Sequence, residues 1–246
     1  LRKAGRAPRC LECGAHWPGH QPALVALAAT GARPTALHNN CSGKHAGFVC
    51  AAVHQGIDPT GYVEPTHPIQ RAIRKAMEEV TGATLIDDVC GTDGCSIPTF
   101  GVPLDALALG FARMATGEGL SPARATAARR IMAACMAHPF MVAGSERFDT
   151  DLMAAFPGRV FVKIGAEGVF CGALPEVGLG FALKIEDGAA RAAEVACAAI
   201  VQAYLPAGLN DTATLDRLTK PGLTNWNGRH VGWLEPTDTL RAALRG

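Results

Sequence analysis

A change of pattern near residue 159 constrains the fold of this chain more than any other feature. Before it, Ala-rich apolar segments show helical spacing, and after it come three short strand-like runs separated by Gly and Pro. The runs cover residues 160–164, 168–174 and 180–185, and they predict an antiparallel meander. A strongly helical segment follows at 189–204. Helices before and after such strands predict an α+β fold with an antiparallel sheet packed against helices.

Helical spacing is clearest from Pro68 to Val80, where Ile69, Ile73 and Met77 lie opposite charged residues. We predict that the apolar segments 23–29 and 45–54 are tightly packed helices, and that residues 87–98 form a rigid Gly-rich loop. Further helices are predicted at 104–116 and 122–137, the latter N-capped by Ser121, with strands at 84–86 and 231–233, a turn at 138–144 and a turn-rich tail beyond Pro206. We expect residues 1–246 to form a single domain.

Composition excludes several classes of protein. The 23 Lys and Arg residues nearly balance 22 Asp and Glu residues and are scattered, so we expect no nucleic-acid partner. The apolar runs are shorter than the roughly 18 to 20 residues that span a bilayer, so we expect no membrane segment. No signal peptide is recognisable, and nine cysteines, an odd number in apolar surroundings, indicate a reducing, cytoplasmic location.

The strongest local motif is the segment from Asn40 to His45. Cys41 and Lys44 stand three residues apart at the start of a predicted helix and therefore share a face. A helix N-terminus favours thiolate and neutral amine, the forms that can bind a metal ion or act in catalysis. The alternative is structural, because Cys is commonly buried and Lys commonly solvated.

A second motif, Gly91-Thr92-Asp93-Gly94-Cys95, carries two more polar side chains. Its flanking glycines let the backbone turn so that Asp93 and Cys95 can point the same way. Together with Cys41 and Lys44 of the first motif, Cys95 would give zinc three ligands. A fourth position would stay open, as in catalytic zinc sites. Asp93 would be a ligand or would orient one, and the alternative is an ordinary turn residue.

Lys163 is the third candidate, on a predicted strand between Val162 and Ile164. Strand alternation makes it face either water or a cavity, so it is either a solvated edge lysine or a lysine of an active site. His16 and His138 could bind metal or substrate, but a histidine beside proline or in a turn is more often structural.

No Ser-x-x-Lys motif occurs in this sequence. The four serines are followed three positions later by other residues, as in Ser42 with His45, Ser96 with Thr99, Ser121 with Arg124 and Ser145 with Phe148. The nucleophile and base unit of serine β-lactamase-like enzymes is therefore missing from it.

Five strings in the same order resemble the Rhizobium etli type of L-asparaginase, and the resemblance covers nearly the whole chain. They are Glu12 to Pro18, His38 to Gly47, Gly91 to Pro98, His138 to Gly144 and Val162 to Gly168. The resemblance implies a serine β-lactamase and glutaminase-like α+β fold, a homodimer, and hydrolysis of L-asparagine to L-aspartate and ammonia.

By the same resemblance, Cys41, Lys44 and Cys95 would be the zinc ligands, and Asp93 would lie close to the metal. We predict that His45 and Asp93 bind substrate and that Lys163 is catalytic, pairing with an active-site serine. The serines of the family precede the region that Leu1 matches, so the chain is expected to be N-terminally incomplete. Asp149 stands where the family is expected to have Cys.

Three other functions remain open. Cys41 could be the nucleophile of an amidase with Lys44 as its base, which needs no zinc. The protein could also be a catalytically incomplete zinc-binding homologue. The fold alone raises a penicillin-binding or β-lactamase activity, against which the lack of a Lys-Thr-Gly strand motif counts.

Overall fold

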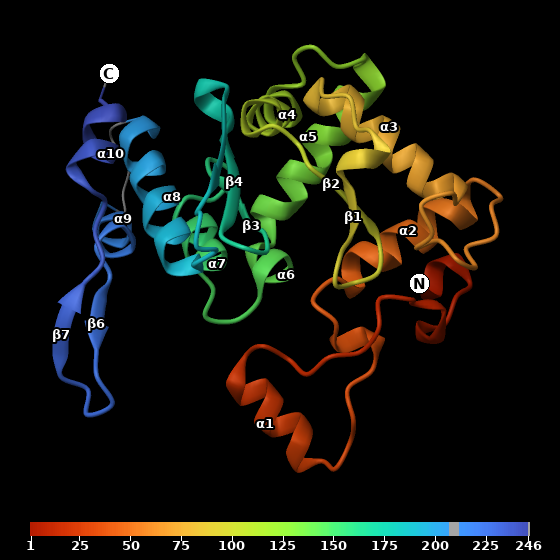
Figure 1. The fold of residues 1–246 in the computed structure, drawn as a ribbon, viewed down its shortest axis with the longest axis horizontal. Helices are drawn as coiled ribbons and strands as arrows, with labels where there is room; N and C mark the ends of the chain where they lie inside the picture. Colours follow the sequence, from red (N-terminus) through yellow and green to blue (C-terminus); the bar gives the residue numbers. More distant parts are fainter. Residues whose placement is uncertain (207–211, 246) are drawn as a thin grey trace. The chain divides into compact units, whose positions relative to one another are not determined.

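The structure is a computed structural model that describes residues 1–206 and 212–245. These residues group into two compact units (Figure 1). Unit 1 comprises Leu1–Glu79 and Ala83–Val102, and unit 2 comprises Val80–Gly82 and the chain from Pro103 onward. The prediction of one domain over the whole chain stays a prediction.

Unit 1 consists of helices and one small antiparallel hairpin. Its elements are η1 (Arg2–Ala4), η2 (Pro8–Cys10), α1 (Gln21–Ala29), η3 (Ala36–His38), α2 (Ser42–His54), α3 (Pro68–Thr81, up to Glu79), η4 (Asp87–Val89), β1 (Cys90–Thr92) and β2 (Pro98–Phe100). The three predicted helices are present. The prediction that the first is tightly packed is wrong, because no residue of α1 is buried. Its Ala-rich sequence favours a helix but presents no single large apolar face.

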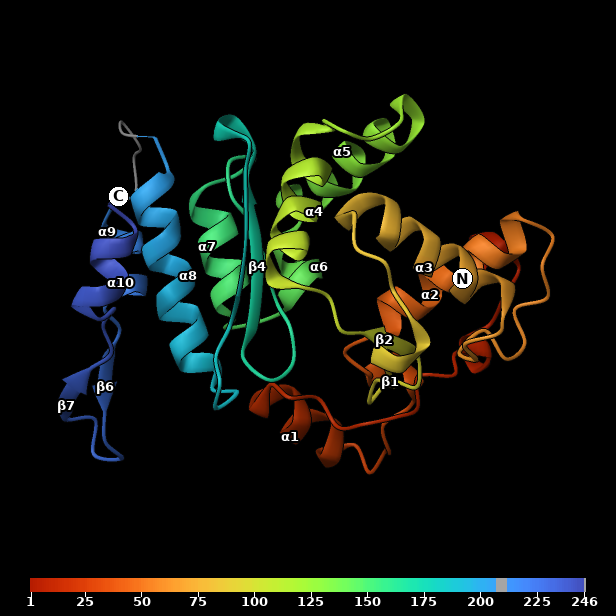
Figure 2. The same cartoon turned by 45° about the horizontal axis from the view of Figure 1, so that its top comes forward.

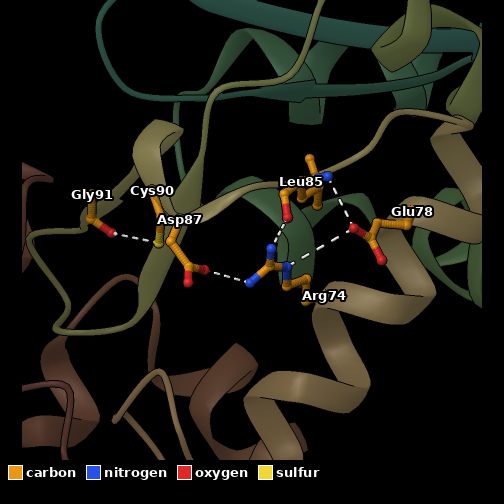
Figure 3. A network of polar contacts seen from close by, with 6 residues as sticks. All are labelled: Arg74, Glu78, Leu85, Asp87, Cys90 and Gly91. Carbon is orange, nitrogen blue, oxygen red and sulfur yellow. Dashed lines mark hydrogen bonds and ion pairs between the residues drawn. The ribbon is translucent and has the colours of Figure 1, made fainter.

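The segment after α3 is held by side chains of that helix (Figure 3). Arg74 donates to Oδ1 of Asp87 at 2.6 Å and to the carbonyl oxygen of Leu85, while the Leu85 N–H donates to Glu78 at 2.9 Å. The predicted strand at 84–86 is therefore wrong. The backbone groups of Leu85 pair with side chains and not with a neighbouring strand.

The Gly-rich segment predicted as a loop is instead largely a β-hairpin. Strands β1 and β2 pair antiparallel, with Gly91 opposite Thr99. The tip is closed by hydrogen bonds from Asp93 N to Ile97 O and from Ser96 N to Asp93 O, both 2.8 Å. Only residues 93–97 form the turn that the glycines predict. This turn carries two of the candidate site residues.

Unit 2 contains the predicted meander. Its elements are α4 (Leu104–Thr116), α5 (Pro122–Ala137), α6 (Pro139–Ala143), α7 (Phe148–Ala155), β3 (Phe161–Ile164), β4 (Val169–Leu174), η5 (Pro175–Val177), β5 (Leu179–Lys184), α8 (Ala190–Tyr204), α9 (Thr212–Thr219), β6 (Gly222–Thr224), β7 (His230–Trp233) and α10 (Asp238–Ala243). Strand order β3-β4-β5 with antiparallel pairing confirms the meander. The α+β fold class is therefore confirmed, while likeness to serine β-lactamases stays a prediction.

The sheet of unit 2 lies between α4 on one side and α7 and α8 on the other (Figure 2). Its core joins β4, α7 and α8, and Phe148 meets Phe170 edge-on with ring centroids 5.4 Å apart. Helix α4 approaches β5 so closely that a Cβ on Gly180 would lie 2.2 Å from the carbonyl oxygen of Ala108. Only glycine fits at that position, because its backbone touches the helix directly.

The segments beyond the core differ from expectation in two places. The predicted turn at 138–144 contains helix α6, since Pro139 is well suited to a first helical position. The tail beyond Pro206 is less turn-rich than predicted, with α9, α10 and a β6–β7 hairpin that includes the expected strand near 231–233. Residues 207–211 of that tail lie outside the described residues. In the part of the chain that is described, every helix is too short or too polar to cross a bilayer.

Candidate metal centre

Two loops of unit 1 carry the candidate ligands. Cys41 is the N-cap residue of α2, and Lys44 lies in the first turn of that helix. Asp93 and Cys95 lie in the turn that joins β1 to β2. The two motifs are about fifty residues apart in sequence, and the fold brings them together.

Three side chains converge there. Sγ of Cys41, a carboxylate oxygen of Asp93 and Sγ of Cys95 all lie within 4.8 Å of one another. Cys95 donates its thiol proton to Oδ2 of Asp93 at 2.7 Å, and its backbone N–H donates to the same oxygen at 3.1 Å. Across residues 1–206 and 212–245, this is the only group of three His, Cys, Asp or Glu side chains that could hold a metal ion.

The hydrogen bond between Cys95 and Asp93 affects both pKa values. It holds the pKa of Asp93 below its usual range, while burial and then this bond raise the pKa of Cys95 to about 11. At neutral pH the pair is therefore a thiol and a carboxylate. A metal ion that binds Cys95 has to displace its proton, because only the thiolate is a ligand.

Lys44 lies beside this group and acts on it through its charge. Its ammonium lowers the pKa of Asp93 and opposes the rise in the pKa of Cys95. The Lys44 side chain is exposed, so it is hydrated as well as close to the acidic groups. The prediction that Lys44 is a metal ligand stays a prediction.

Asn39 holds the Cys41 side of the group in place. This side chain is buried, its Oδ1 accepts from Cys41 N at 2.8 Å, and its Nδ2 donates to Cys13 O at 2.7 Å. Cys13 is itself buried and packs in one apolar cluster with Cys95 and Cys41. Next to them, Asn40 N donates to Nε2 of His16 at 3.0 Å, so His16 has a structural partner.

His45 is wholly buried one residue further along α2. Its Nδ1 lies 2.6 Å from the Tyr62 hydroxyl, which also accepts from Glu12 N at 2.8 Å. The Tyr62 hydroxyl therefore joins the His45 ring to the backbone of Glu12. Nε2 has no partner among the described residues. Burial and then the Lys44 charge lower the pKa of His45 to about 4, so the ring is neutral at pH 7.

Sequence reasoning missed Asn39, Tyr62 and Glu12 as supports of this site. Glu12 and Asn39 lie inside two of the strings that carry the resemblance, which is the signal that could have pointed to them. Tyr62 had no such signal, because its partners are 17 and 50 residues away. The assignment of His45 to substrate binding stays a prediction beside this structural role.

Lys163 belongs to unit 2, on the edge strand β3, and its side chain is exposed. Its Nζ donates to the carbonyl oxygen of Ile164 at 2.5 Å. Both interpretations of this lysine, solvated edge residue and active-site residue, are compatible with that position. His138 is exposed between α5 and α6.

A cavity of about 240 Å³ also lies in unit 1, next to the Arg74 network. Its lining is Pro65, Thr66, Gln70, Arg71, Arg74, Asp87, Cys90, Pro98 and Phe100. None of the predicted site residues belongs to this lining.

The fold and the site together define a class: an α+β protein in which two cysteines and an aspartate form a group that could hold a metal ion. The family model of L-asparaginase II matches residues 1–236, so the chain belongs to the L-asparaginase II family. That membership supports amidohydrolase activity on asparagine, and thus a small-molecule substrate. Among curated proteins, none gives a significant match to this chain.

Proposed function

We propose that this protein is a zinc-containing L-asparaginase of the Rhizobium etli type, active as a homodimer in the cytoplasm. In it, Cys41, Lys44 and Cys95 hold zinc, with Asp93 beside the metal. The observation that carries the proposal is the mutual approach of the Cys41, Asp93 and Cys95 ligand atoms to within 4.8 Å. Sulfur and carboxylate donors suit zinc, so the residues present fit this metal.

When bound, zinc would supply Lewis acidity and would orient the amide or the α-amino and α-carboxylate groups of asparagine. The residues of the chain have separate tasks. Asp93 accepts a hydrogen bond from the Cys95 thiol and, as a carboxylate, can bind the substrate α-ammonium group. His45 is neutral at pH 7, and its Nε2, which has no partner among the described residues, is available for a hydrogen bond to the substrate.

Lys163 is assigned to proton transfer. In the neutral form its Nζ would take the proton of a nucleophilic serine as that serine attacks the side-chain amide carbon of asparagine. Lys163 would then pass that proton to the amide nitrogen, the C–N bond would break to release ammonia, and water would hydrolyse the aspartyl ester and regenerate the serine. The nucleophilic serine in this proposal is the one that the family resemblance implies.

Zinc content and asparagine hydrolysis measured on the same sample test this proposal. Cys41→Ala and Cys95→Ala are expected to lose the metal, while Cys90→Ala, in the same hairpin, should keep it. Cys90 is the matched control because its thiol donates only to the neighbouring Gly91 carbonyl at 3.6 Å. About one zinc per chain, lost in both site variants, would support the metal assignment.

The other outcomes separate the competing functions. No zinc in the unmutated protein would refute the metal assignment. Zinc without hydrolysis would favour a catalytically incomplete homologue. Hydrolysis that resists chelators but is abolished when iodoacetamide alkylates Cys41 would favour the amidase in which Lys44 is the base.

A further inference from the structure

We propose that Asp149 is a positioning residue for Lys163 and holds the end of strand β3 from which that lysine projects. The inference deepens the proposed function, on which it rests, because Lys163 is the catalytic lysine there. All of the groups involved belong to unit 2.

Asp149 is a buried carboxylate with one hydrogen-bond partner. It lies in the first turn of α7 with an exposed fraction of 0%. Its Oδ2 accepts from Ile164 N at 2.8 Å, and its Oδ1 has no partner among the described residues. Because Ile164 is the only hydrogen-bond partner of the carboxylate there, a change at Asp149 should act on the backbone through Ile164, while loss of its charge also acts on Glu194 and Cys197 of α8.

The bond closes an open edge of the sheet. Strand β3 pairs only with β4, and Gly165 N donates to Val169 O at 2.8 Å across the β3–β4 turn. Hydrogen-bonded and non-hydrogen-bonded pairs alternate in an antiparallel ladder, so the N–H of Ile164 points away from β4. Asp149 therefore supplies the acceptor that a further strand would otherwise provide.

That anchor also fixes the backbone of Lys163. The N–H of Ile164 belongs to the peptide group that follows the Lys163 Cα, so the bond to Asp149 sets its rotation. The carbonyl oxygen of Ile164 accepts from Lys163 Nζ at 2.5 Å. Asp149 thus controls the direction in which the lysine side chain leaves the sheet.

The start of α7 is a rigid support for this bond. Oγ1 of Thr150 donates to Gly144 O at 2.7 Å, and Phe148 packs edge-on against Phe170 in the core. The first turn of α7 therefore ties the segment around α6 to the end of β3. This arrangement gives the string from His138 to Gly144, which the proposed mechanism does not use, a supporting role.

The test compares Asp149→Asn, which keeps an acceptor oxygen, with Asp149→Leu, which keeps the branching of the side chain but has no acceptor. Asp151→Asn on the same helix is the matched control, since Asp151 only approaches Arg217 at 3.9 Å. The rate at which an acylating reagent modifies Lys163 is measured against pH by peptide mass spectrometry. Lys184, which likewise donates to the carbonyl of the next residue at the end of an edge strand, is the internal reference.

We expect the Leu variant to change the pH profile of Lys163 modification while Lys184 is unaffected, and the Asn variant to restore it. In asparagine hydrolysis, the Leu variant should lower kcat roughly tenfold to a hundredfold with little change in KM, because a displaced proton acceptor impairs the chemical step more than binding. An unchanged Lys163 profile in a folded Leu variant would overturn the inference.

Two further measurements keep the test decisive. If the Leu variant does not fold, the exchange rate of the Ile164 amide in the unmutated protein is used, and exchange as fast as in a free strand edge overturns the inference. Lys163→Ala separates the two proposals. If that variant keeps full hydrolysis while Asp149→Leu alters the Lys163 profile, the positioning stands and the catalytic assignment fails.

Discussion

Acidification should destabilise this protein through His45. The ring is wholly buried, and its pKa of about 4 in the folded protein lies below the ordinary value of 6.5. The unfolded chain therefore binds the proton first, so stability is lost as the pH falls from 6.5 towards 4. Integrated between pH 7 and pH 4.5, this difference in pKa corresponds to about 2 kcal/mol of unfolding free energy.

The measurement is urea unfolding at both pH values after metal removal, for the unmutated protein, His45→Gln and His54→Gln. His54 is the matched control because it is exposed at the other end of the same helix. The His45 variant should lose stability at pH 7 but show an acid dependence smaller by about 2 kcal/mol, while the His54 variant should match the unmutated protein. An equal acid dependence in all three proteins would refute the reasoning.

Three other substitutions follow from buried contacts. Tyr62→Phe leaves Glu12 N without its acceptor and should cost about 2 to 3 kcal/mol in urea unfolding, whereas the exposed Tyr204→Phe should cost less than about 0.5 kcal/mol. Gly180→Ala should lower the melting temperature, since the added methyl would lie 2.2 Å from a carbonyl oxygen of α4. Asp93→Asn should lower the pKa of the neighbouring thiol from about 11, as an NMR titration of its Cβ would show, and an unchanged value would contradict the role of the hydrogen bond.

Hydrophobic periodicity predicted helices and strands well where the apolar residues recur at the spacing of the element and are buried on one face. The amphipathic helix from Pro68 and the meander of β3, β4 and β5 are both present. The predicted strand at 84–86 failed because Arg74 and Glu78 bind the backbone of Leu85, a contact that strand propensity does not contain. The hairpin of β1 and β2 was missed because its glycines predict a turn, and the two strands are too short to give a strand pattern of their own.

The candidate metal ligands could be predicted from the sequence, but the residues that hold them in place could not. Motif reasoning identified Cys41, Asp93 and Cys95, and the fold brings these three together. Which residues hold them could not be read from spacing, because Asn39 and Tyr62 act through hydrogen bonds to partners far away in sequence. Such contacts depend on how loops meet in three dimensions, which local pattern does not determine.

These supports hold the backbone of the proposed metal site through contacts within the protein itself. Asn39 fixes the amide of Cys41, and backbone hydrogen bonds close the turn that carries Asp93 and Cys95. What opposes metal binding is therefore less the ordering of the loops than the proton on Cys95, which burial and Asp93 both retain. Metal affinity should then rise with pH up to the pKa of that thiol, with about one proton released from Cys95 per ion bound at neutral pH.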